Sequence, residues 1–142
     1  MSGRIVAALL AVSCVALSTV PAHAQETAGV AVINFTKFVP VAQGVVVPAG
    51  QTARFNVDAR NYGRVSLLIA GETRPDAGPI GLQTLFGPPL VPGSEPRPVP
   101  VNADGRIALS FVEPARGPAL VIVIHNDSAA DARLTISAYL AN

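Results

Sequence analysis

Few residues in this chain could carry chemistry, and the first of them is a histidine. His125 follows an apolar run and opens the segment His125-Asn126-Asp127-Ser128. A histidine here could act as general base for a serine, with Asp127 or Asp131 as the supporting carboxylate. No nucleophile signature such as G-x-S-x-G accompanies it. We therefore favour the alternative, a histidine at a strand end that bonds to loop backbone.

Two glutamates give a second possible chemistry. Glycoside hydrolysis needs two carboxyl groups about 5–10 Å apart across a cleft, and Glu72 and Glu113 both lie at the ends of expected strands. Such a pair has little specificity, because polar residues gather at strand ends in any small β protein. We expect no enzyme activity, and a small secreted hydrolase is an alternative.

Metal ligation has weak support in the sequence. Zinc needs about three or four nitrogen, sulfur or carboxylate ligands, and after residue 24 the chain has one histidine and no cysteine. Calcium needs roughly six to eight oxygens, and two loops hold acidic or amide residues, at 126–131 and 58–61. Neither loop has the spacing of a known motif. We expect no cofactor and no metal, while a structural calcium ion stays open.

Ligand binding has four candidate residues besides His125. A sugar-binding face normally presents aromatic rings, and the chain has no tryptophan. Tyr62 in an expected hairpin loop and Tyr139 on an outward face could contact a glycan, although packing within the protein is the alternative. Phe86 and Leu90 flank or lie in a proline-rich stretch that matches P-x-x-P, and it could present both to an envelope protein.

Alternating apolar and polar residues predict the strands that position these side chains. Strict alternation predicts four strands, at 52–58, 64–70, 106–112 and 133–140. Weaker patterns predict three more, at 30–38, 43–47 and 80–86. The run 119–124 is apolar on both faces, which is typical of a central strand. Phe35, Phe55 and Phe111 are expected in the core.

These patterns predict the fold class. Turn signals such as Asn102-Ala103-Asp104-Gly105 separate the strands, and no amphipathic helix is expected after residue 24. About seven or eight short strands predict an all-β fold, a single antiparallel β-sandwich of jelly-roll or immunoglobulin-like topology. Of the 13 prolines, eight lie between residues 71 and 100. We expect a Pro/Gly-rich insert there, and we expect binding at loops on one end of the sandwich.

The first 24 residues have the pattern of a bacterial secretory signal peptide. Arg4 is followed by a mostly apolar run at 5–20, and Ala22-His23-Ala24 precedes Gln25 as an A-x-A cleavage site. Cleavage after Ala24 would leave one β-sandwich domain at 25–142, secreted or periplasmic, with no transmembrane span. The single cysteine, Cys14, lies in this leader. The mature chain therefore cannot form a disulfide.

Charge narrows the class of partner. The formal net charge is +1 at pH 7, and only 13% of the residues are charged. A chain of this kind lacks the basic surface that nucleic acids need. We therefore expect an exported, non-catalytic protein that binds a glycan or another envelope component, or has a structural role. A carbohydrate-binding module is a further alternative.

Overall fold

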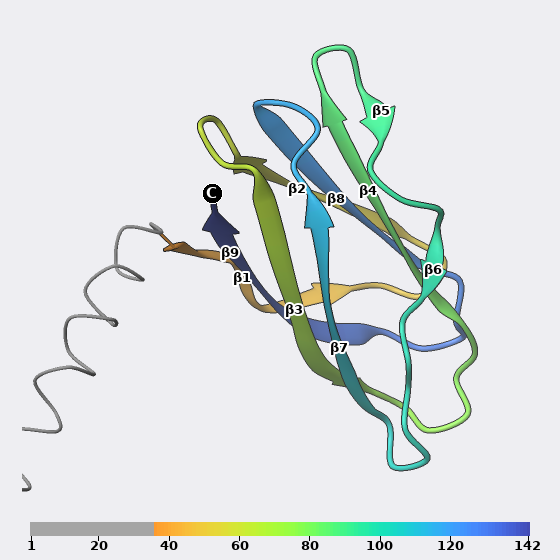
Figure 1. The fold of residues 1–142 in the computed structure, drawn as a ribbon. Helices are drawn as coiled ribbons and strands as arrows, with labels where there is room; N and C mark the ends of the chain where they lie inside the picture. Colours follow the sequence, from red (N-terminus) through yellow and green to blue (C-terminus); the bar gives the residue numbers. More distant parts are fainter. Residues whose placement is uncertain (1–35) are drawn as a thin grey trace, which may run out of the picture. The chain divides into compact units, whose positions relative to one another are not determined.

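Nine strands and no helix make up residues 36–142, the part of the chain that this computed structural model describes (Figure 1). In chain order they are β1 (Thr36–Val47), β2 (Thr52–Asp58), β3 (Arg64–Thr73), β4 (Ile80–Gly87), β5 (Val91–Pro92), β6 (Arg97–Pro98), β7 (Arg106–Pro114), β8 (Ala119–Asn126) and β9 (Ala132–Ala141). Within this range no helix is available to cross a bilayer. The expected cleavage at Ala24, the strand residues 30–35 and Phe35 lie outside the described residues.

The strands form two antiparallel sheets. Sheet A has the order β1-β9-β3-β7, and sheet B has the order β2-β8-β4-β5, with β6 also paired to β4. Apart from the β4–β5–β6 segment, each connection leads from one sheet to the other. This interleaving of two Greek keys is the jelly roll. The predicted antiparallel sandwich is confirmed, and the strand order selects the jelly roll over the immunoglobulin-like alternative.

Alternation along each strand builds the core between the sheets. In β9 every second side chain from Ala132 to Leu140 is buried, and β3 buries Val65, Leu67 and Ile69 in the same way. Phe55 and Phe111 point inward as expected, although both remain only partly buried. The Arg97 guanidinium lies 3.9 Å from the ring centroid of Phe111, which links the edge of sheet B to that of sheet A.

The Pro/Gly-rich segment 71–100 contains the strand expected at 80–86 and belongs to the sandwich. Its central portion is β4, which pairs with β8 from Ile80 to Gly87. The proline-rich portion returns along β4 as two short strands, β5 and β6. Each pairs over two residues only, because proline has no N–H to donate to the ladder. The prolines therefore mark an interrupted edge strand.

Phe86 was expected to contact a partner at the surface, and the structure shows that it is buried instead. Its side chain is 0% exposed and belongs to the core, whereas Leu90 at the β4–β5 turn is 54% exposed. The reason is the twofold period of β4, which points Ile80, Leu82 and Phe86 into the sandwich. Phe86 is therefore a core residue, and only Leu90 is available to a partner.

A buried cluster of hydrogen-bonded polar groups, the Asn126 cluster, joins the loops at one end of the two sheets. Asn126 is 0% exposed, and its Nδ2 donates to the carbonyls of Val47 and Ala130 at 2.9 Å each. Its Oδ1 accepts from the backbone N–H and the hydroxyl of Ser128, at 3.2 and 2.6 Å. Asn126 thus holds the end of β1, in sheet A, and the β8–β9 loop against β8, in sheet B.

We predict that Phe86→Ala lowers the free energy of unfolding by about 3–5 kcal/mol, because it removes a fully buried ring and leaves a cavity. The matched control, Leu90→Ala, should change it by about 0.5 kcal/mol or less. Urea unfolding of the three proteins measures both values. Equal losses for the two variants would contradict the assigned faces of β4.

We predict that Asn126→Ala lowers the free energy of unfolding by about 2–4 kcal/mol, because the Val47 carbonyl and Ser128 lose their partner and the Ala130 carbonyl loses one of two donors. Asn56→Ala is the control, since Asn56 is exposed on β2, and it should have an effect within about 0.5 kcal/mol. Thermal or urea unfolding reports the difference. A loss of unfolding free energy for Asn126→Ala no larger than that of the control would show that the Asn126 cluster is dispensable for stability.

Candidate functional site

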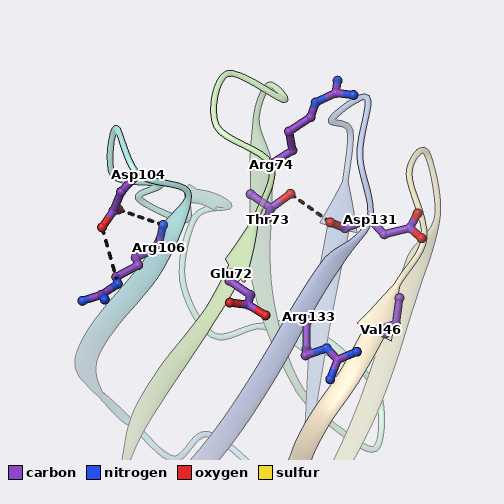
Figure 2. Close-up of a pocket in the computed structure, with 8 residues that line it drawn as sticks. All are labelled: Val46, Glu72, Thr73, Arg74, Asp104, Arg106, Asp131 and Arg133. Carbon is purple, nitrogen blue, oxygen red and sulfur yellow. Dashed lines mark hydrogen bonds and ion pairs between the residues drawn. The ribbon is translucent and has the colours of Figure 1, made fainter.

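A charged cleft of about 440 Å³ lies at the end of sheet A that is next to the Asn126 cluster (Figure 2). It forms where the β3–β4, β6–β7 and β8–β9 loops meet the ends of four strands. Three arginines, three carboxylates, a threonine and a valine line it: Arg74, Arg106, Arg133, Glu72, Asp104, Asp131, Thr73 and Val46. Opposite charges are thus present in equal number around the cleft.

The strand register produces the floor of this cleft. Glu72 on β3 pairs with Arg106 on β7 and with Arg133 on β9, and Arg133 pairs with Val46 on β1. We call Arg106, Glu72 and Arg133 the charged row. Directly paired residues share one face of a sheet, and all three side chains are exposed on the outer face of sheet A (Figure 2).

Loop backbone holds the walls of the cleft. The Asp131 carboxylate accepts from the Ala49 N–H at 3.0 Å, and the Thr73 hydroxyl donates to the Asp131 carbonyl at 2.9 Å. Gly105 has a φ of +85°, and a Cβ at this position would collide with the Thr73 carbonyl oxygen. Only glycine therefore lets the β6–β7 loop approach β3 so closely.

The cleft presents charge and no nucleophile. The Asp104 carboxylate accepts from the Arg106 backbone N–H at 3.1 Å and lies 3.4 Å from its Nε. Within residues 36–142 the side chains of Glu72, Arg74 and Arg133 have no ion pair or hydrogen bond inside this cleft. Its one hydroxyl, on Thr73, is already a donor to Asp131. The arrangement suits recognition of charged groups.

His125 does not assemble a catalytic triad. Its Nδ1 lies 3.0 Å from the Thr52 hydroxyl across β2 and β8. The Ser128 hydroxyl is committed to Asn126 and Ala130, and the Asp131 carboxylate to Ala49. The histidine is thus a strand-end residue that bonds to a neighbouring side chain, where the sequence had favoured loop backbone.

Glu72 and Glu113 do not face one cleft. Glu72 is on the outer face of sheet A and pairs with Arg106, while Glu113 lies seven residues further along β7, about 24 Å away. The Glu113 side chain points inward, is 5% exposed, and has no hydrogen-bond partner for either carboxylate oxygen among the described residues. The carboxylate pair proposed for a glycosidase is therefore not formed.

Tyr62 and Leu90 lie at the end of the sandwich opposite the charged cleft. Tyr62 lines a hollow of about 360 Å³ between the β2–β3 and β7–β8 loops and also packs against the core.

An exposed ion pair lies near Tyr62. The Arg60 guanidinium donates to both Asp58 oxygens and lowers the pKa of Asp58 from its ordinary 3.8 to about 2. This exposed pair is therefore complete at neutral pH and is lost as the pH falls through about 2.

Tyr139 belongs to an exposed apolar strip on the outer face of sheet A. Its ring lies 5.1 Å from that of Phe38, centroid to centroid, at 46°. Four large apolar side chains form the apolar strip and are 39–61% exposed: Phe38, Leu68, Val112 and Tyr139. All four surround Ser66 in the register, since Ser66 pairs with Tyr139 and Val112.

The three arginines and Asp104 of the cleft were not among the residues singled out from the sequence, while Glu72 and Asp131 were considered there only for catalysis or metal binding. A weak signal existed, because Arg106 and Arg133 begin alternating strands at outward positions and Glu72 ends one. Their convergence depends on which strands pair, which a local pattern does not contain. Among residues 36–142 no group of three or more His, Cys, Asp or Glu side chains could hold a metal ion.

Comparisons with known proteins concern the fold alone. No family model and no curated protein matches the sequence. Among solved structures, CBM4 is 10% identical with a TM-score of 0.46 over 75% of this chain and 71% of that chain. The PRD1 vertex protein P5 is 12% identical with a TM-score of 0.49 over 77% and 95%. Latent PorU from Porphyromonas gingivalis is 11% identical with a TM-score of 0.49 over 76% of this chain and 13% of that chain. These likenesses assign neither a family nor a function.

Proposed function

We propose that this protein is an exported, non-catalytic interaction module that binds another protein through the outer face of sheet A. The observation that carries the proposal is the combination, on one face, of the apolar strip and the charged row. Burying exposed apolar area supplies affinity, and a pattern of opposite charges supplies register and selectivity. The protein would act in the cell envelope or outside the cell, as the leader pattern in the first 24 residues indicates.

The apolar strip supports binding because these side chains would otherwise stay in contact with water. Scattered exposed apolar residues are common, but a contiguous patch on a flat sheet face is typical of interaction surfaces. The centre of the same face carries small side chains, among them Ala70, Ala108, Ser110 and Ser137. A partner can therefore approach the sheet closely between the strip and the charged row.

Catalysis has less support than binding. The proposed general base His125 has neither a carboxylate nor a serine as hydrogen-bond partner, and Glu72 and Glu113 lie on opposite faces. A small secreted hydrolase would need residues that neither arrangement supplies. We therefore place the function of this chain in recognition.

Glycan binding is the second candidate, favoured by the exposed pair of rings Phe38 and Tyr139. Aromatic rings that reach solvent can stack on the apolar faces of sugars. The 46° angle between the two rings, however, presents no common plane to a sugar chain. A protein surface, which can adapt to both rings and to Leu68, fits this strip better.

We predict that a photo-crosslinker at Val112 captures a protein on the intact exporting cell, because Val112 is 61% exposed within the apolar strip. The control is the same crosslinker at Asn56 on the outer face of sheet B. We expect one discrete adduct, identified by mass spectrometry, from Val112 and none from Asn56. Leu68→Asp, at an exposed position, should suppress the adduct by inserting a charge into the strip.

Equal crosslinking from both faces, or none from either, would contradict the proposal. Retention of a defined soluble glycan that is lost in Tyr139→Ala, without any protein adduct, would replace it by the second candidate. Far-ultraviolet circular dichroism of each variant checks that the sandwich is intact.

A further inference from the structure

We infer that the protein bound to the outer face of sheet A is a second copy of this chain, in a two-fold symmetric dimer. This inference rests on the proposed function and names its partner. The two copies would pack sheet A against sheet A, with the two-fold axis parallel to the strands and between β9 and β3. The strand register carries the inference, because it determines which side chains would face each other.

Charge complementarity between the two copies favours this arrangement. Across β7, β3, β9 and β1 the register gives the order Arg106, Glu72, Arg133 and Val46. The two-fold axis reverses this order in the second copy. Glu72 therefore faces Arg133 of the second copy, and Arg133 faces its Glu72, so that two equivalent ion pairs form. Within one described copy, neither Arg133 nor Arg106 forms an ion pair with Glu72. The dimer gives Glu72 and Arg133 the ion-pair partners that they lack in one copy, while Arg106, already paired with Asp104, faces Val46 of the second copy.

The same rotation matches the apolar strip with itself. The row at the other end has the order Val112, Ser66, Tyr139 and Phe38. After reversal, Phe38 faces Val112 of the second copy, and Tyr139 faces its Ser66. Large side chains thus meet small or medium ones, which is the complementarity that a symmetric interface requires.

The other orientation of the copies is unfavourable. A two-fold axis across the strands would place the charged row of each copy on the aromatic rings of the other. That arrangement buries charges without partners, which costs more free energy than the apolar contacts return. The placement of Glu72 and Arg133 at one end and of the two aromatic rings at the other therefore favours the axis along the strands, although Arg64 lies on the same face near the apolar strip and Val46 near the charged row.

The size and shape of the face suit a dimer of moderate affinity. Four strands about 4.8 Å apart and about nine residues long cover roughly 600 Å² in each copy. The total of roughly 1,200 Å² lies at the lower end of specific interfaces. The small side chains between the charged row and the apolar strip allow the sheets to approach to about 10 Å, the usual separation of packed sheets. We therefore expect an equilibrium between monomer and dimer.

Charge-reversal variants at the two facing positions, Glu72 and Arg133, test this inference. Sedimentation equilibrium of the full chain, produced through an export route, gives the dissociation constant of the dimer. Glu72→Arg alone and Arg133→Glu alone should each raise it about tenfold or more, because each variant places like charges face to face twice. An equimolar mixture of the two variants should recover dimers. In the mixed dimer the arginine introduced at position 72 faces the glutamate introduced at position 133, and the native Arg133 faces the native Glu72. Arg54→Glu on the outer face of sheet B is the control and should leave the constant unchanged.

Three results would overturn the inference: a wild-type monomer at all concentrations, a dimer insensitive to both single variants, or a mixture that remains monomeric. Recovery in the mixture cannot arise from contacts within one chain, so it is specific to the two-fold pairing. A monomer whose Val112 crosslinker captures a different protein would overturn the dimer and leave the proposed function standing. A monomer that captures nothing from Val112 would overturn both.

Discussion

The site depends on one buried interaction, the hydrogen-bonded side chain of Asn126. In a jelly roll most connections cross between sheets, so the loops at each end must be held together for the sheets to stay aligned. Asn126 does this because its amide satisfies two carbonyls and its oxygen accepts from Ser128 twice. A buried amide with every partner present is specific in geometry, whereas apolar packing tolerates sliding. The Asn126 cluster thereby determines where the β8–β9 loop, with Asp131, meets β1 and β3.

This alignment of the loops and strands determines which side chains lie next to one another on the outer face of sheet A. Once β9 lies between β1 and β3, the pairing places Arg133 beside Glu72, and Tyr139 beside Phe38. A shift of one residue would reverse the faces of β9 and bring Leu134 and Ile136 to the surface. The core therefore maintains the register, because those side chains are fully buried. The charged row and the apolar strip are consequences of the same burial that stabilises the sandwich.

Two buried polar side chains show opposite solutions in this fold. Asn126 is completely bonded, while Glu113 is buried with neither oxygen bonded among the described residues. A buried carboxylate without donors opposes folding, so the stability of the domain must come from the apolar interior that surrounds it. The chain has a single cysteine and therefore no intrachain disulfide to add to that stability. Packing between the two sheets carries this task, with Arg97 on Phe111 at their edges.

The strands and their inward faces could be predicted from local sequence. The alternation in 52–58 predicted β2 at its observed bounds, and the inward positions of Phe55 and Phe111 were predicted correctly. This succeeds because alternation records the burial of each strand locally. The burial of Phe86 emerged from the packing of the two sheets, because the alternation in 80–86 is weak, with the apolar Leu85 at an outward position. The charged row of Arg106, Glu72 and Arg133 emerged in the same way, because strand pairing joins residues 34 and 61 positions apart in the chain. No local pattern contains that distance.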